Sequence, residues 1–241
     1  MKKIFFTLLA LVGTMSMNAQ VMKVMKNGQD TPVETYNGSD YYVVFEEAPA
    51  GPTTGTEKRK GDIEVNWIQL WKDGPKFAEY NVGATSATEH GGYYCWGGTY
   101  QNGDHIAWND DHNTGTETLS GDNDTATKLW GSNWRMPTKD EWIALKNNCT
   151  YSWTTQNSVK GILFTGKGNY SSNSIFLPAA GYCQETAIGG YIWSGGEGYY
   201  WSSTPASSST LAKYAEMTDV LKMSGDDARG RAFLVRPVLA E

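Results

Sequence analysis

The sequence Trp134-Arg-Met-Pro-Thr-Lys-Asp-Glu-Trp142 decides the fold around it, because several local rules agree there on one conformation. Thr138 precedes Glu141 by three residues, which is the spacing of a capping box. In such a box the Thr hydroxyl accepts the N–H of the Glu, and the Glu carboxylate accepts the N–H of the Thr. This pattern predicts a helix that begins at Lys139 and ends near Asn148.

The neighbours of the box support the same helix. Pro137 lies just before it, where a missing N–H costs nothing, and Trp142 and Leu145 share one helical face. No other stretch predicts a helix as strongly. The many Trp, Tyr and Gly residues on either side indicate strands and turns packed around it.

The first residues have the pattern of a secretory signal peptide. Lys2 and Lys3 form a basic start, residues 4–12 are apolar, and Ala19 ends a small-residue cleavage site. An uncleaved anchor is the alternative, but the apolar run is shorter than the roughly 20 residues that span a bilayer. We therefore expect residues 1–19 to be removed, and an exported chain found in the periplasm, on the outer cell surface or secreted.

The composition restricts the class of protein. The chain of 241 residues carries a net charge of −6 with both signs interspersed, which argues against nucleic-acid and anionic-membrane partners. No later stretch is apolar enough for a transmembrane helix. The 10 Trp, 14 Tyr and 27 Gly residues are typical of a turn-rich exported module with an aromatic core.

Cysteine and histidine are scarce. Export permits a disulfide among Cys95, Cys149 and Cys183, and each of the three possible pairings leaves one thiol over. No Cys-x-x-Cys spacing occurs, and the only histidines are at positions 90, 105 and 112. We expect no metal site and no cofactor.

The order of segments predicts three parts after the signal peptide. Residues 20–47 have the pattern of a small β-hairpin with a turn at Asn27-Gly28. Residues 48–61 are rich in Pro, Gly and Thr and are interpreted as a linker. The main domain then covers 62–241, with strands expected at 63–70, 78–83, 161–165, 174–178, 199–203, 213–217 and 231–237.

Residues 101–124 are almost wholly polar and rich in Asp. Calcium binding is one interpretation, but the spacing of an EF-hand and its terminal Glu are missing, so a solvated surface loop is favoured. Asp124 is placed to cap a helical turn over 125–130 that Gly131 ends.

Seven motifs in a fixed order carry a resemblance to a known family. They are Asn81-Val-Gly-Ala-Thr, Gly92-Tyr-Tyr-Cys-Trp-Gly, Trp134-Arg-Met-Pro-Thr, Glu141-Trp, Leu177-Pro-Ala-Ala-Gly-Tyr182, Tyr200-Trp-Ser-Ser-Thr204 and Val235-Arg-Pro-Val238. From residue 63 to 238 the chain resembles the Fibrobacter succinogenes major paralogous domain, which is abundant in exported proteins of Bacteroides-like bacteria. The resemblance implies an α+β, C-type-lectin-like fold in its formylglycine-generating-enzyme variant: an irregular antiparallel sheet, one or two short helices and long loops.

The enzymes of that fold use chemistry that this sequence lacks. Their reactive C-terminal cysteine pair is missing, because no Cys follows Cys183, and a His-ligated iron site has no matching residues. Neither a nucleophile elbow nor a His-Glu-x-x-His helix is present. A polysaccharide hydrolase with two carboxylates stays an alternative, although Asp226 and Asp227 are adjacent and would face opposite ways in a strand. A non-catalytic chain is expected.

A binding module is the favoured function. Residues 189–201 are dominated by Gly, Tyr, Trp and Ser, a composition that provides large contact area at low entropy cost. The candidate ligand-binding residues are Tyr191, Trp193, Glu197 and Tyr199, with Lys213, Tyr214, Asp226 and Arg229 at the rim of the same face. Glycan and protein ligands both fit, and the calcium-dependent sugar motifs of true C-type lectins are absent. The N-terminal hairpin also allows a third class, a structural subunit of a surface assembly.

The remaining motif positions are interpreted as structural. Arg135 and Arg236 are expected to bind buried carbonyls or Glu141, because the planar guanidinium satisfies several acceptors at once. Tyr200 is favoured as a core residue. The other residues with an expected structural role are Trp134, Pro137, Thr138, Glu141, Trp142 and Trp201.

Overall fold

The computed structural model of the chain contains two compact units, Met1–Ala50 and Gly51–Glu241. In the first unit β1 (Gln20–Lys26) pairs antiparallel with β2 (Tyr41–Glu47). The expected signal peptide and the Asn27-Gly28 turn lie outside the described residues. The structure describes the backbone of 20–26 and 41–47, and residues 51–99, 112–186, 189–193, 196–218 and 220–240.

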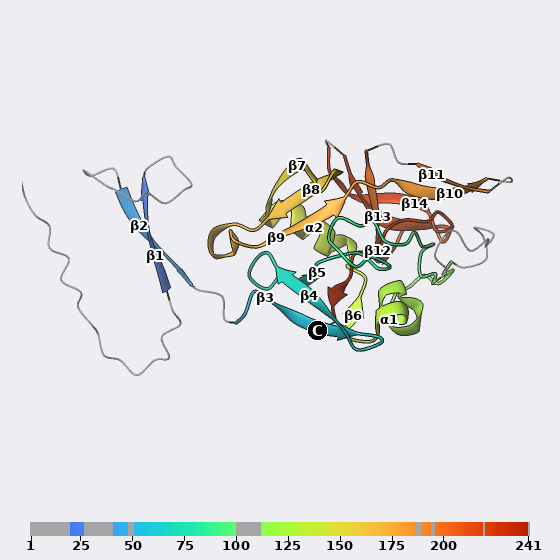
Figure 1. The fold of residues 1–241 in the computed structure, drawn as a ribbon, viewed down its shortest axis with the longest axis horizontal. Coiled ribbons are helices and arrows are strands. Elements are labelled where there is room, and N and C mark those ends of the chain that lie inside the picture. Colours follow the sequence, from blue (N-terminus) through green and yellow to red (C-terminus); the bar gives the residue numbers. More distant parts are fainter. Residues whose placement is uncertain are drawn as a thin grey trace, which may run out of the picture. The chain divides into compact units, whose positions relative to one another are not determined.

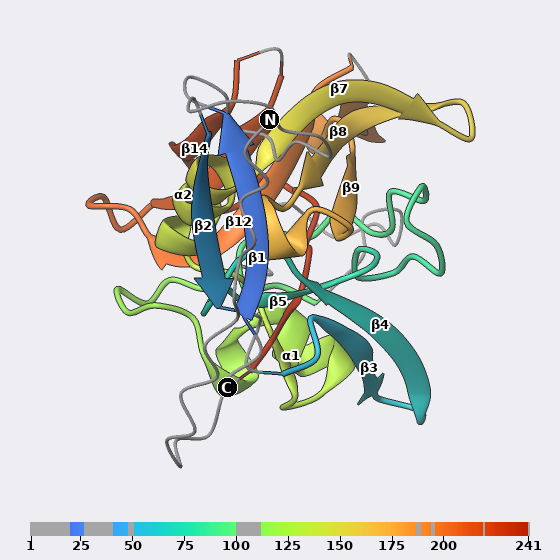
Figure 2. The ribbon, with the colours of Figure 1, turned by 90° about the vertical axis from the view of Figure 1, so that its left-hand side faces the viewer.

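The second unit is a mostly-sheet α+β fold with curled antiparallel sheets (Figures 1 and 2). Its described residues contain two α-helices, α1 (Thr125–Trp130) and α2 (Lys139–Asn148), and two short 3-10 turns. The largest sheet has the order β3-β4-β5-β15-β6, so the last strand of the chain inserts between β5 and β6. Its strands are β3 (Thr54–Arg59), β4 (Ile63–Gln69), β5 (Lys76–Ala78), β15 (Val238–Leu239) and β6 (Trp134–Arg135).

Three smaller antiparallel sheets complete this unit. One has the order β7-β8-β9, the second β12-β13-β14, and the third is the hairpin β10-β11. The strands of the first are β7 (Thr150–Gln156), β8 (Val159–Thr165) and β9 (Ser174–Pro178). The others are β12 (Gly198–Pro205), β13 (Leu211–Met217), β14 (Lys222–Ala228), β10 (Tyr182–Thr186) and β11 (Gly189–Trp193).

The capping box that begins α2 is confirmed, with the predicted helix bounds. The Thr138 N–H donates to the Glu141 carboxylate at 2.7 Å, and the Glu141 N–H donates to the Thr138 hydroxyl at 3.2 Å. Both carboxylate oxygens of Glu141 also accept from the Arg135 guanidinium, at 2.6 and 2.8 Å. Burial by itself raises the pKa of Glu141, but the hydrogen bonds from Arg135 and Thr138 outweigh it and the pKa lies below its usual value.

The interior consists of two aromatic clusters that meet at β12. The first contains Trp142 of α2, Phe164 of β8 and Tyr200 of β12, and the second contains Trp134 and Trp201. Successive residues of a strand face opposite ways, so Tyr200 and its neighbour Trp201 enter different clusters. The Trp201 ring stacks on Phe233 with ring centroids 4.2 Å apart.

The buried Arg236 joins three segments of the second unit. Its guanidinium donates to the Asn81 side chain at 2.8 Å and to the carbonyls of Ala78, Glu79 and Phe176 at 2.9, 2.6 and 2.9 Å. Burial lowers the pKa of Arg236 to about 10, which leaves it charged at neutral pH. Its expected role in binding buried carbonyls is confirmed.

The other motif residues also serve the interior. The indole of Trp134 donates to the Lys58 carbonyl and that of Trp142 to the Trp201 carbonyl. The carbonyl of the buried Pro137 accepts the Ser203 N–H at 2.8 Å. These contacts fix the stretch that begins α2 against β3 and β12.

Several predicted segments differ in the structure. The linker assigned to 48–61 is wrong in its second part, because β3 pairs with β4 along its whole length. The strand predicted at 78–83 contributes only Ala78, because the backbone bends at Glu79 and Tyr80 and then turns at Gly83, where φ is +82°. The strand predicted at 231–237 forms single bridges to three different segments, and the strand beside β13 is β14, which the sequence did not indicate.

The structure also shows the state of the three cysteines and the surroundings of Asp124. The structure contains no disulfide among Cys95, Cys149 and Cys183. Asp124, expected at the end of a solvated loop, is fully buried and accepts the N–H groups of Thr127 and Met136 at 3.0 and 2.9 Å. It is the N-cap of α1, as predicted.

Candidate functional site

The predicted aromatic surface near the C-terminus is described only in part. Tyr191 and Trp193 lie on β11, opposite Gln184 and Tyr182, but their side chains are outside the described residues. Tyr199 donates its hydroxyl to the Glu197 carboxylate at 2.5 Å. Burial, followed by this hydrogen bond, raises the pKa of Tyr199 above its ordinary value. Tyr199 and Glu197 are thus hydrogen-bonded to each other, and the Tyr199 ring packs edge-on against the Tyr182 ring.

Tyr214 and Arg229 were predicted at the rim of that surface, and the structure buries both side chains almost completely. Tyr214 is 6 % exposed and belongs to the second aromatic cluster. Arg229 is 1 % exposed: its guanidinium lies 4.2 Å from the Trp96 ring centroid and donates to backbone carbonyls. Those carbonyls belong to Leu211, Asn113 and Gly115.

The other two rim residues form an ion pair with each other. Lys213 and Asp226 are opposite one another on β13 and β14, and the Lys213 ammonium contacts the Asp226 carboxylate. Lys213 and Tyr214 are neighbours on one strand, so their side chains leave opposite faces of the sheet. The four predicted rim residues therefore do not share one face of the sheet, although the Tyr214 ring centroid lies 5.9 Å from that of Tyr199. Asp227 binds Arg231 at 2.8 Å instead of joining Asp226 as a carboxylate pair.

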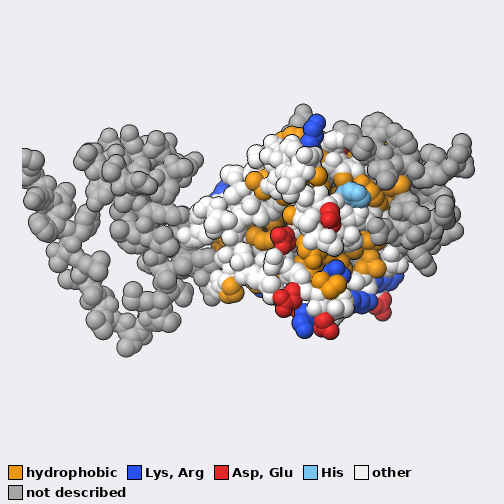
Figure 3. All heavy atoms as spheres, viewed as in Figure 1, with side chains coloured by type: hydrophobic (Ala, Val, Ile, Leu, Met, Phe, Trp, Pro, Cys, Tyr) orange, Lys and Arg blue, Asp and Glu red, His pale blue; other side chains and the backbone are white. Residues whose placement is uncertain are grey.

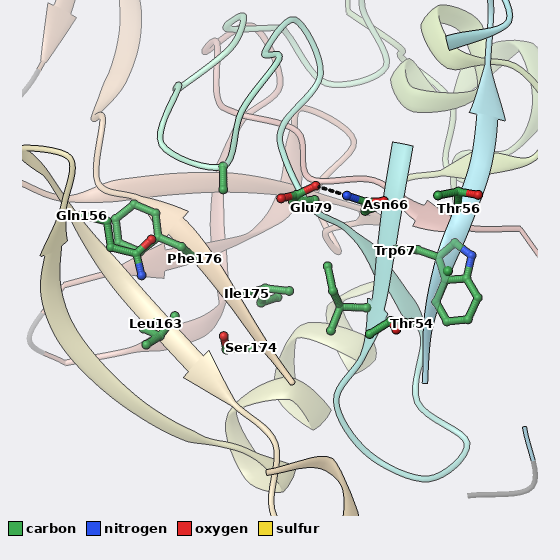
Figure 4. Close-up of a pocket in the computed structure, with 13 residues that line it drawn as sticks. Thr54, Thr56, Asn66, Trp67, Glu79, Gln156, Leu163, Ser174, Ile175 and Phe176 are labelled. Carbon is green, nitrogen blue, oxygen red and sulfur yellow. Dashed lines mark hydrogen bonds between the residues drawn. The ribbon is translucent and has the colours of Figure 1, made fainter. Parts of the chain in front are cut away.

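A groove elsewhere in the second unit brings together more uncommitted polar groups. It has a volume of about 470 Å³ and lies between the β3-β4 ribbon and the β7-β8-β9 sheet (Figure 4). Its lining residues are Thr54, Gly55, Thr56, Asn66, Trp67, Ile68, Glu79, Ala87, Gln156, Leu163, Ser174, Ile175 and Phe176.

The alternation of β4 builds one wall of this groove. Val65 and Trp67 are buried in the second cluster, so Asn66 and Ile68 emerge on the opposite face. The register places Thr56 opposite Asn66 and Thr54 opposite Ile68. Hydroxyl, amide and aliphatic side chains therefore share this wall.

Glu79 is fixed on the same wall by two hydrogen bonds to one residue. Its backbone N–H donates to the Asn66 carbonyl at 2.8 Å, and the Asn66 amide donates to its carboxylate at 2.7 Å. Figure 4 shows the two side chains directed toward each other. The carboxylate is thereby oriented while keeping capacity for further donors.

The opposite wall combines an apolar surface with two polar groups. Leu163, Ile175 and Phe176 supply the apolar part, and Gln156 and Ser174 line the groove from the same sheet (Figure 4). Sequence reasoning missed this site. Its only signal was the polar Asn66 between the apolar Val65 and Trp67, since the facing residues come from strands about 100 positions later.

The described residues also form a second hollow of about 320 Å³, whose lining includes His112, Thr210 and Arg229. The buried His112 Nδ1 and Arg229 Nη2 atoms have no hydrogen-bond partner among the described residues. In the described part of the chain, no group of three or more His, Cys, Asp or Glu side chains is arranged to hold a metal ion. No helix among those residues has the length and apolar character to cross a membrane. Along the lower edge of the face shown in Figure 3, acidic and basic side chains of the second unit lie close together.

Comparison with known protein families, with curated proteins and with solved structures finds no match to this chain.

Proposed function

We propose that this chain is an exported, non-catalytic binding module whose groove between β3-β4 and β7-β9 binds a neutral saccharide. The observation that carries the proposal is the Glu79 carboxylate, which the Asn66 amide orients in a groove that Thr54, Thr56 and an apolar wall also line. A sugar presents hydroxyls that donate and accept along its rim and C–H groups on its faces. The two walls complement both kinds of surface.

Charge favours a neutral ligand over an anionic one. Glu79 is the only ionisable residue among those that line the groove. An anion would meet this carboxylate in a chain of net charge −6, whereas paired sugar hydroxyls donate to it. The ligand is therefore a neutral glycan.

The single carboxyl group in the groove lining also supports binding without catalysis. Glycoside hydrolysis needs two carboxyl groups on either side of the scissile bond. The groove lining contains one. The groove therefore offers no second carboxyl group to act as the acid or base in hydrolysis of a bound polysaccharide.

The fold and location complete the proposal. The antiparallel sheets, the two short helices and the order of the seven motifs support a C-type-lectin-like module of the major paralogous domain family. The basic and apolar residues at positions 2–12 support export. An exported module with one sugar groove fits a role in adhesion or glycan capture at the cell surface.

The test is binding of the chain from Gln20 to Glu241 to a panel of neutral and acidic glycans, followed by calorimetry on the best neutral one. We expect Glu79→Gln to weaken binding at least tenfold, because a hydrogen bond to a charged group contributes about 1.5–3 kcal/mol. Asp140→Asn, which removes an exposed carboxylate from α2, is the matched control and should bind like the wild type.

Two results would contradict the placement of the site. One is saturable binding that Glu79→Gln leaves unchanged. The other is binding that survives Glu79→Gln but is lost in Trp193→Ala/Tyr199→Ala, which would return the site to the C-terminal surface. Absence of binding to every neutral glycan would reject the saccharide itself.

A further inference from the structure

The β7 strand is an open edge without the usual protection. It is the outer strand of the β7-β8-β9 sheet (Figures 1 and 2), and none of the backbone hydrogen bonds of the described residues joins its outer side. Its sequence, Thr150-Tyr-Ser-Trp-Thr-Thr-Gln156, has no charged residue, no Pro and no Gly. Natural edge strands are normally blunted by Lys, Pro or a bulge, because free N–H and C=O groups invite another strand.

The same strand exposes two large aromatic side chains on one face. Tyr151 and Trp153 are 45 % and 42 % exposed. They lie opposite Phe164 and Ile162 of β8, which are buried in the first cluster. Directly opposed residues share a face, so the apolar face of the sheet continues past the core onto an uncovered strand.

We propose that β7 pairs antiparallel with β7 of a second copy of this chain, with a twofold axis at Trp153. Trp153 is the central residue of the strand, so this register pairs all seven residues. Trp153 then lies opposite its own copy, Tyr151 opposite Thr155, and Ser152 opposite Thr154. The result is a continuous six-stranded sheet across the dimer.

The register keeps the two apolar faces together. Side chains alternate along a strand, and a twofold axis through a residue pairs odd positions with odd positions. Tyr151 and Trp153 of both copies therefore emerge on one face, continuous with the core residues of each β8. A shift of one position would turn one aromatic face away from the other.

The absence of charge favours a second copy as the occupant. In a twofold pairing any charge on β7 lies close to its own duplicate, and like charges on opposed strands are destabilising. An uncharged strand avoids this cost. It also offers no charge pattern by which a different protein would be selected. Twofold dimers with self-complementary interfaces are the commonest oligomers.

A tight two-residue turn fixes β7 against β8. Asn157 and Ser158 form the two-residue turn to β8 and have φ of +47° and +66°, the signs that a type I′ turn requires.

One strand pair buries less surface than a standard interface, so a weak dimer with a dissociation constant of about 10–100 µM is expected.

Sedimentation equilibrium of the chain from Gln20 to Glu241 tests the proposal. The wild type should be mainly dimeric at roughly 500 µM and monomeric at roughly 1 µM. Ser152→Lys/Thr154→Lys places lysines opposite each other across the axis and should raise the dissociation constant at least tenfold. Ser152→Glu/Thr154→Lys places opposite charges there and should restore or tighten the dimer.

Val220→Lys is the control for added charge, because Val220 is 71 % exposed on another part of the unit. It should dimerise like the wild type. A wild-type chain that stays monomeric at the highest concentration overturns the proposal. So does a double-lysine variant that dimerises like the wild type, or a Glu/Lys variant as weak as the double-lysine one. The double variants sit at exposed or half-buried positions outside the core, and circular dichroism confirms that each is folded.

Discussion

Replacement of Arg236 by Met should be among the most destabilising single changes in the second unit. The guanidinium is fully buried and donates four hydrogen bonds, three of them to backbone carbonyls. Met fills similar space but donates none, so four buried acceptors lose their donor. At about 1 kcal/mol for each acceptor, the loss is about 4 kcal/mol.

The loss should be visible in both chemical and thermal unfolding. For a unit of this size, about 4 kcal/mol corresponds to a fall in Tm of roughly 8–16 °C. Urea unfolding followed by tryptophan fluorescence gives the free energy directly, since Trp134, Trp142 and Trp201 are buried in the clusters that Arg236 supports. Arg236→Lys keeps the charge without the planar fork and should lie between Met and the wild type.

Lys139→Met is the matched control. Lys139 is a partly exposed cation whose ammonium contacts Asp140 at 2.7 Å on the first turn of α2. Its removal should change the free energy of unfolding by less than about 0.5 kcal/mol. If Arg236→Met costs less than about 1 kcal/mol, or no more than the control, the idea that this arginine ties the three segments together is wrong.

Thr138→Ala should destabilise the chain by about 1 kcal/mol, measured by urea unfolding, because the N-cap of α2 loses its acceptor. The pKa of Glu141 is lowered in the folded state, so its contribution to stability is present above the usual pKa of a Glu and is lost as the pH falls through the folded value. Urea unfolding from pH 6 to pH 3 should therefore show a steeper decline for the wild type than for Glu141→Gln. An equal decline in both proteins would contradict the lowered pKa of Glu141 in the folded state. Burial raises the pKa of the Cys149 thiol to about 12, so alkylation by iodoacetamide at pH 8 should label Cys149 only after unfolding, as peptide mass spectrometry would show. Labelling of the folded chain at Cys149 would indicate local opening around α2.

The parts of the fold that the sequence predicted are those set by neighbouring residues. The bounds of α2 follow from the box formed by Thr138 and Glu141, and the start of α1 follows from Asp124. β3 and β14 were missed because their polar sequences have little strand preference. Both exist because a partner strand, β4 or β13, offers its hydrogen-bonding edge.

The candidate site was beyond sequence reasoning for a related reason. Glu79 and Asn66 meet because β4 and β5 pair, and the facing wall with Gln156 and Phe176 comes from distant strands. Aromatic and glycine-rich composition pointed instead to 189–201. In the structure Tyr199 lies against Tyr182 and Phe233, so part of that aromatic signal reflects packing.

The position of β12 between the two aromatic clusters has a consequence for folding. Since Tyr200 anchors one cluster and Trp201 the other, neither cluster can open without losing the strand that the other also needs. The second unit should therefore melt in a single transition, and no half-folded species should accumulate at equilibrium. The backbone amides of β12 should be among the last to exchange with deuterium, and they should do so at the same free energy as those of α2.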